Sequence, residues 1–113
     1  TDELLSRIIQ TLQGQQDYQT AMLYLSDHGE SLGENGVYLH GLPYWMAPDA
    51  QTKVPMLWWM SDTYASTQQL KAECMAQRTT QKLSHDNLFH SLLGIFQISS
   101  KIHRQSLDVF RPC

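Results

Sequence analysis

The feature that most constrains the fold is a continuous apolar run, Ala21–Leu25, that ends at Ser26. Because its residues do not alternate between apolar and polar, the run predicts a strand buried on both faces, as in a parallel sheet. A second run covers Val54–Met60, and Pro55 favours a strand that begins there or lies at a sheet edge. Residues 29–53 between the runs are rich in glycine and proline and predict a long ordered loop, and such loops are usually functional.

Three helices are predicted around these strands. Apolar residues at helical spacing predict the first over residues 1–13, capped by Thr1 and ended by Gly14. The second is expected from about residue 63 to 77, and the third begins at Ser84 with an apolar face made of Leu88, Phe89, Leu92, Leu93 and Phe96. Strands that alternate with helices predict an α/β domain, a mostly parallel sheet flanked by helices.

Composition excludes some functions. The 113 residues fit one domain, and a formal charge of −3 with scattered Lys and Arg argues against nucleic-acid binding, which needs a clustered basic face. No apolar run approaches the roughly 20 residues of a membrane span. The two cysteines, Cys74 and Cys113, are compatible with an oxidising compartment. They can pair with each other, which is worth roughly 4 kcal/mol in the chain-entropy model, or be unrelated thiols.

Asp27 and His28 directly follow the first predicted strand, where ligands bind in open α/β sheets. Zinc accepts carboxylate oxygen and imidazole nitrogen, and Gly29 permits the sharp turn that lets adjacent residues reach one ion. An ordinary loop contact is the alternative for such a pair taken alone. His40 follows a glycine-rich excursion that can return it to the strand end, and Glu30 is either a further ligand or an acceptor that orients His28.

The motif extends over residues 26–41, Ser-Asp-His-Gly-Glu-Ser-Leu-Gly-Glu-Asn-Gly-Val-Tyr-Leu-His-Gly. This run resembles the signature of bacterial phosphoethanolamine transferases, membrane-anchored zinc enzymes of the alkaline-phosphatase-like superfamily that modify lipid A and include colistin-resistance proteins. The resemblance continues through Pro43-Tyr44, Ala47-Pro48, Gln51-Thr52, Val54-Pro55-Met56, residues 84–90 and the Leu-Asp-x-Phe-x-x-Cys pattern of residues 107–113.

The resemblance implies that residues 1–113 are the C-terminal part of a periplasmic catalytic domain at the bacterial inner membrane. Asp27 and His28 would be zinc ligands, and His40 and Glu30 would contact the phosphoryl group or a second zinc. The threonine nucleophile, a glutamate ligand and the transmembrane helices are expected in the remainder of the polypeptide. The substrates would be phosphatidylethanolamine and lipid A, and this chain alone is expected to be inactive.

The other histidines and the tryptophans carry weaker signals. His85 and His90 are five residues apart, which places them on different faces of the last helix and favours structural roles. His103 lies in a tail with little periodicity. Trp45, Trp58 and Trp59 could touch lipid, although tryptophans in or beside an apolar strand usually belong to the core. Glu34 and Asn35 fit a tight turn before Gly36.

Three alternatives stay open at this point. The acceptor could be another envelope sugar, such as core heptose. The enzyme could be a sulfatase or phosphoglycerol transferase of the same superfamily, which also use Asp-His ligands. The chain could instead be a non-catalytic zinc-binding fragment, for which zinc binding at micromolar or better affinity by the chain alone would speak.

Overall fold

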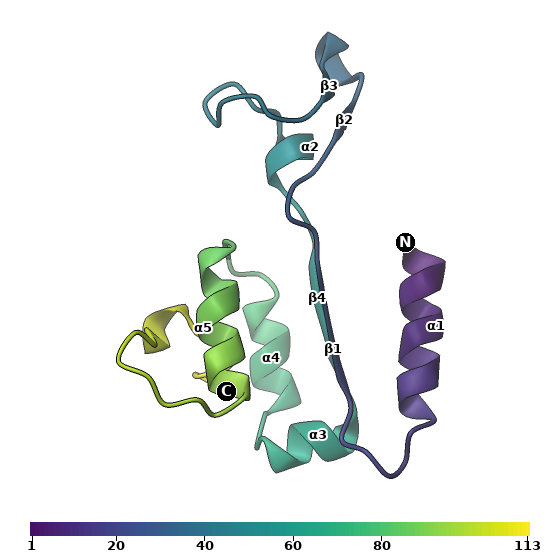
Figure 1. Cartoon of the computed structure of the whole chain (residues 1–113), viewed down its shortest axis with the longest axis vertical. Coiled ribbons are helices and arrows are strands. Elements are labelled where there is room, and N and C mark those ends of the chain that lie inside the picture. Colours follow the sequence, from purple (N-terminus) through teal and green to yellow (C-terminus); the bar gives the residue numbers. More distant parts are fainter. The chain divides into compact units, whose positions relative to one another are not determined.

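The computed structural model describes residues 1–113, which form two compact units (Figure 1). Unit 1 comprises Thr1–Gly14 and Ala21–Trp59, and unit 2 comprises Gln15–Thr20 and Met60–Cys113. None of the helices combines the length and the apolar character that are needed to cross a membrane.

Unit 1 begins with α1, Asp2–Gln13, in agreement with the predicted helix. Thr1 occupies the N-cap position, Asp2 and Glu3 lie in the first turn, where negative charge suits the helix dipole, and Gly14 follows the last turn. No residue of α1 is buried, and the side chain of Leu4 is 61% exposed.

The two apolar runs form strands β1, Ala21–Leu25, and β4, Met56–Met60, which are hydrogen-bonded neighbours. β4 begins directly after Pro55, as predicted. The N–H of Ser61, after β4, donates to the carbonyl of Thr20, before β1, over 2.9 Å. At the other end the N–H of Gly29 donates to the carbonyl of Gln51 over 3.0 Å. The two strands therefore run in opposite directions, a detail that apolar runs do not encode because they report burial and not chain direction.

The predicted long loop contains short regular elements. Strands β2, Ser31–Leu32, and β3, Tyr38–Leu39, pair antiparallel around the 3₁₀ turn η1, Glu34–Gly36, and the short helix α2 covers Asp49–Thr52. The turn needs left-handed backbone, which Asn35 (φ 55°) and Gly36 (φ 75°) supply. This confirms the tight turn expected at these residues.

Unit 2 is helical, with α3 at Asp62–Thr67, α4 at Ala72–Arg78, α5 at Asp86–Ile95 and the 3₁₀ turn η2 at Gln105–Leu107. Ser61 caps α3 by accepting the N–H of Tyr64, as expected. The single helix predicted over residues 63–77 is wrong in extent. The chain breaks between α3 and α4, where Gln69 adopts a left-handed conformation with φ 57°.

The apolar face that the sequence predicted for α5 is covered only in part, with Leu88, Leu92 and Leu93 half-buried. The buried residues are Asn87, Ser91 and Ile95, whereas Phe89 is 48% and Phe96 69% exposed. The cause is the C-terminal tail. Its residues hydrogen-bond to polar groups of the helix: the Asn87 side chain donates to the Leu107 carbonyl (2.9 Å), and the Ser91 hydroxyl accepts the Val109 N–H (2.9 Å). Val109 and Phe110 complete this small core.

A disulfide joins Cys74 in α4 to Cys113 at the end of the tail, with 5.4 Å between the two Cα atoms. This resolves the open question of whether the two cysteines pair with each other. The bond closes the chain over a separation of 39 residues and fixes the tail within unit 2.

Candidate metal centre

Asp27 and His28 lie immediately after β1, where the sequence placed them. Both are exposed, Asp27 with 90% and His28 with 44% of the side chain accessible. The Asp27 Oδ1 accepts the backbone N–H of His28 over 3.1 Å, and its Oδ2 lies 3.9 Å from the His28 Nε2. One carboxylate oxygen of Asp27 is therefore held by the backbone of His28, and the other lies near the imidazole of His28.

The orientation of the His28 imidazole is fixed by the backbone of the next residue. Its Nδ1 lies 2.9 Å from the carbonyl oxygen of Gly29. A carbonyl can only accept, so the Nδ1 carries the proton and donates it, and Nε2 is left with its lone pair. Histidines that ligate metals commonly use one ring nitrogen in this way and bind the ion with the other.

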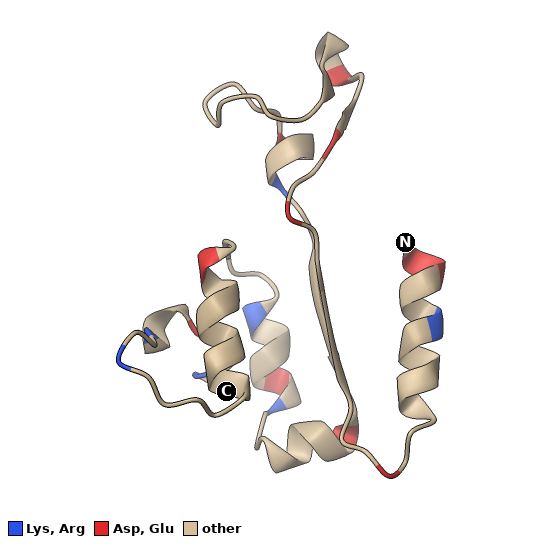
Figure 2. Ribbon diagram, viewed as in Figure 1, with Lys and Arg blue, Asp and Glu red and all other residues tan.

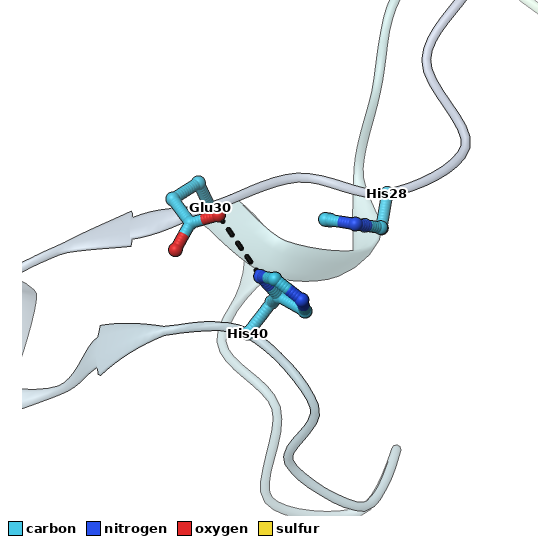
Figure 3. Close-up of side chains that lie close together, drawn as sticks. All are labelled: His28, Glu30 and His40. Atoms are coloured by element: carbon cyan, nitrogen blue, oxygen red, sulfur yellow. Dashed lines mark hydrogen bonds and ion pairs between the residues drawn. The ribbon is translucent and has the colours of Figure 1, made fainter.

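The hairpin β2–β3 places Glu30 opposite His40. Its register pairs Ser31 with Leu39 and Leu32 with Tyr38, so Glu30 and His40 are the next facing positions in the antiparallel sequence. The Glu30 Oε2 accepts from the His40 Nδ1 over 3.0 Å (Figure 3). The glycine-rich excursion thus returns His40 to the strand end, as predicted. Glu30, which was weighed as an acceptor for His28, in fact orients His40.

His28, Glu30 and His40 form one cluster (Figure 3). One ligand atom from each lies within 4.8 Å of the other two, and the imidazole rings of the histidines have centroids 4.0 Å apart. All three are exposed. Asp27 is not one of the three members of this cluster, but its carboxylate lies next to one of them, His28.

The donor atoms present fit a zinc ion. Two atoms that each lie about 2.0–2.1 Å from one zinc are at most about 4.2 Å apart. The 3.9 Å between Asp27 Oδ2 and His28 Nε2 satisfies this limit. The ligand atoms of the three-residue cluster lie within 4.8 Å of one another, a separation close to this limit. Imidazole nitrogen and carboxylate oxygen are the ligand types that zinc prefers after thiolate.

Helix α2 contacts the segment of residues 28–31, which carries His28 and Glu30. Gly29 donates to Gln51, and an added Cβ at Gly29 would overlap the carbonyl oxygen of Ala50 and lie 2.9 Å from its carbon. Behind Glu30, the buried Ser31 hydroxyl accepts from the Gln51 side chain over 2.9 Å. The glycine is therefore required by close backbone approach, and the segment is held by α2 on either side of Glu30.

Glu34, near the cluster in sequence, has a structural role. Its Oε2 accepts the N–H of Leu32 over 2.8 Å. Hydrogen bonds from its own N–H and from that of Leu32 lower the pKa of the Glu34 carboxyl below its ordinary value of 4.5. The carboxylate thus stabilises the turn that joins β2 to β3.

His90 and His103 contribute to the packing of unit 2. The His90 Nδ1 accepts the N–H of Arg104 over 3.1 Å, which supports the structural role predicted for it. His103, which the sequence left without a signal, is 15% exposed and places its Nε2 3.3 Å from the Oδ2 of Asp108, which is 2% exposed. Gly94 makes room for this carboxylate, because a Cβ there would overlap Asp108 Oδ2. In the sequence, only the family resemblance over residues 107–113 drew attention to Asp108.

Comparisons with known proteins show what this chain is similar to in sequence. The sulfatase family model matches residues 1–98. The phosphoethanolamine transferase EptA of Escherichia coli K12 is 46% identical over 99% of this chain. The chain spans about a fifth (21%) of the length of that relative.

Two solved structures are similar over nearly the whole chain. The soluble domain of lipooligosaccharide phosphoethanolamine transferase A from Neisseria meningitidis has a TM-score of 0.92 at 36% identity, covering 99% of this chain and 34% of that domain. The C-terminal periplasmic domain of phosphoethanolamine transferase EptC from Campylobacter jejuni has a TM-score of 0.84 at 43% identity, covering 98% of this chain and 34% of that one. These matches confirm the alkaline-phosphatase-like α/β fold class, and the chain belongs to the sulfatase family.

Proposed function

We propose that the polypeptide containing these residues transfers phosphoethanolamine from phosphatidylethanolamine to a lipid A-type acceptor, with zinc bound at the end of β1. The observation that carries the proposal is the convergence of His28, Glu30 and His40, with Asp27 alongside, in one exposed cluster. The similarity to the Escherichia coli phosphoethanolamine transferase and to the Neisseria meningitidis lipooligosaccharide phosphoethanolamine transferase supports the reaction class.

Asp27 and His28 would hold the zinc ion. When bound, zinc polarises phosphoryl oxygens and lowers the pKa of a hydroxyl nucleophile. The residues of this chain provide the matching arrangement: the Gly29 carbonyl keeps the His28 Nδ1 protonated and its Nε2 available, and Asp27 keeps a carboxylate oxygen 3.9 Å from that nitrogen. The nucleophile is expected among residues outside this chain.

His40 and Glu30 would serve the transferred phosphoryl group or a second zinc. Because Glu30 accepts the Nδ1 proton, the Nε2 of His40 is the atom left to interact with substrate or metal. As an imidazolium it would donate a hydrogen bond to a phosphoryl oxygen, and the carboxylate of Glu30 would stabilise that positive charge. As neutral imidazole it would ligate a metal ion through the same nitrogen.

The proposed location is the periplasmic face of the bacterial inner membrane, with the membrane anchor in the remainder of the polypeptide. The disulfide between Cys74 and Cys113 supports an oxidising compartment. The similarity to the periplasmic domain from Campylobacter jejuni supports the same compartment.

The test is transfer of phosphoethanolamine by the complete polypeptide, measured with lipid A as acceptor, before and after removal of zinc by a chelator. We expect chelation to abolish transfer and added zinc to restore it. His28→Ala should lower kcat/KM by about 100-fold or more, as expected for loss of a metal ligand, and Glu30→Gln by about 10–100-fold through loss of its support for His40. His85→Ala, at the start of α5 and outside the cluster, is the matched control and should leave transfer unchanged.

Donor and acceptor comparisons separate the alternatives. Hydrolysis of aryl sulfates without transfer of phosphoethanolamine would replace the proposal with a sulfatase. Transfer of phosphoglycerol would indicate a phosphoglycerol transferase. Transfer of phosphoethanolamine to core heptose but not to lipid A would retain the donor and change the acceptor.

A further inference from the structure

The segment between Glu34 and Asp49 contains no Asp, Glu, Lys or Arg, although it is mostly exposed. In Figure 2 the ribbon between the red residues of η1 and α2 is tan, the colour of residues other than Lys, Arg, Asp and Glu. Exposed loops ordinarily carry charge, and the flanking residues do so. A charge-free exposed stretch is therefore a feature that needs a physical reason.

The tip of this segment presents aromatic and apolar side chains to the outside. Tyr44 is 91%, Trp45 83% and Met46 52% exposed. A turn holds the tip in place, because the N–H groups of Met46 and Ala47 both donate to the carbonyl of Pro43 (2.8 and 2.9 Å). The exposed side chains are thus displayed by an ordered turn.

The composition of the tip fits the surface of a phospholipid bilayer. Tyrosine and tryptophan combine an apolar ring with a polar group and are enriched at membrane interfaces for that reason. A surface that binds anionic lipid carries clustered Lys and Arg, whereas this segment is uncharged and so complements a zwitterionic lipid. The exposed apolar residues of α1, by contrast, lie on a helix that also carries Asp2, Glu3 and Arg7, the usual pattern of a helix that packs against protein.

The tip is continuous with the candidate metal centre. His40 lies four residues before Tyr44, and only Gly41, Leu42 and Pro43 separate the two. We propose that Tyr44, Trp45 and Met46 dock on a zwitterionic phospholipid surface and so bring the phosphate of a bilayer lipid to His40. This inference rests on the proposed function and deepens it, since it assigns the residues that would select a membrane-embedded donor.

The first experiment measures docking without any reaction. The chain has three tryptophans, and Trp58→Phe with Trp59→Phe leaves Trp45 as the single tryptophan, whose emission can be excited selectively. With vesicles of phosphatidylethanolamine and phosphatidylcholine that carry brominated acyl chains, we expect a blue shift and quenching of Trp45. The matched control is Trp45→Phe, which keeps the two tryptophans of β4 and should show neither change. Circular dichroism of each variant checks that the fold is retained.

The second experiment uses the complete polypeptide and compares two forms of the donor. Trp45→Ser should raise KM for phosphatidylethanolamine in vesicles by about tenfold, the effect of about 1.4 kcal/mol of lost interfacial binding. It should leave kcat/KM for a short-chain, water-soluble donor within about twofold, and Trp45→Tyr should restore the vesicle reaction. Tyr18→Ser, which removes an aromatic ring that is 69% exposed in unit 2, is the control.

The outcomes separate the docking proposal from the proposed function. Equal losses with both donors, together with no quenching of Trp45, would mean that the tip contacts protein and would overturn the docking proposal. A wild-type polypeptide that transfers from neither donor while Trp45 is quenched would refute the proposed function and leave membrane docking supported. Unquenched Trp45 with unchanged KM for vesicles would refute docking alone.

Discussion

Replacement of Gly29 by alanine should separate the geometry of the candidate metal centre from its chemistry, because it changes no ligand. The added Cβ would overlap the carbonyl oxygen of Ala50, a backbone atom of α2 that cannot rotate away. The hydrogen bond from the Gly29 N–H to the Gln51 carbonyl, 3.0 Å long, would be lost as the two segments separate. His28 and Glu30 flank this position and would move with it.

The expected cost follows from these two effects. Overpacking against fixed atoms costs about 1–3 kcal/mol, and the lost hydrogen bond about 0.5–1.5 kcal/mol. The alanine also lowers the entropy of the unfolded chain, which stabilises by about 0.4–1 kcal/mol. The net loss in the free energy of unfolding is therefore about 0.5–4 kcal/mol.

Urea denaturation of unit 1, followed by the fluorescence of the tryptophans in β4, measures this loss, and zinc titration of the same variant measures the effect on the site. Gly14→Ala is the matched control, because Gly14 has φ −72° and a Cβ there would make ordinary contacts, with the Thr11 and Gln10 carbonyl oxygens at 3.4 and 3.8 Å. It should be neutral or slightly stabilising. Equal stability and equal zinc affinity of the two alanine variants would refute the argument that α2 fixes the ligand segment.

Three further predictions concern the framework of the chain. Reduction of the Cys74–Cys113 disulfide, which spans 39 residues, should lower the free energy of unfolding of unit 2 by about 4 kcal/mol, and an unchanged urea midpoint with reductant would contradict this. Gly94→Ala should destabilise unit 2 by about 1–3 kcal/mol, because the new Cβ would overlap the carboxylate of Asp108, which is buried and accepts the Phe110 N–H over 2.9 Å; thermal unfolding that matches wild type would argue against this packing. The Glu34 carboxyl should titrate below pH 4.5 in NMR, and because its folded pKa is lowered, its stabilisation is present above that pH and lost as pH falls through the folded value; a titration at the ordinary value would refute the turn hydrogen bonds.

The elements of unit 1 could be predicted because they depend on local signals. The apolar runs predicted β1 and β4, Pro55 marked the start of β4, and Glu34 and Asn35 marked the turn between β2 and β3. The return of His40 to the strand end was also predictable, since a glycine-rich excursion between short strands closes on itself. The partner of Glu30 was not, because it depends on the register of β2 and β3, and two-residue strands leave little pattern in a sequence.

Unit 2 was harder to predict because polar side chains decide its packing. Apolar spacing marked Phe89 and Phe96 as the buried face of α5, yet Asn87 and Ser91 are buried because the tail satisfies them with hydrogen bonds. Apolar periodicity identifies only apolar residues as buried, and so it misses polar side chains that are buried because they have hydrogen-bond partners. The disulfide between Cys74 and Cys113 holds that tail in place, and the sequence left the pairing open.

The register of the β2–β3 hairpin has a consequence for how the site forms. Glu30 and His40 are ten residues apart, and the contact between them closes a loop of that length. Such closures take about 10–100 ns and a hairpin about 1–10 μs, far less than pairing between distant segments such as β1 and β4. We therefore expect Glu30 and His40 to meet in a fast, local event, before the pairing of β1 with β4 is complete.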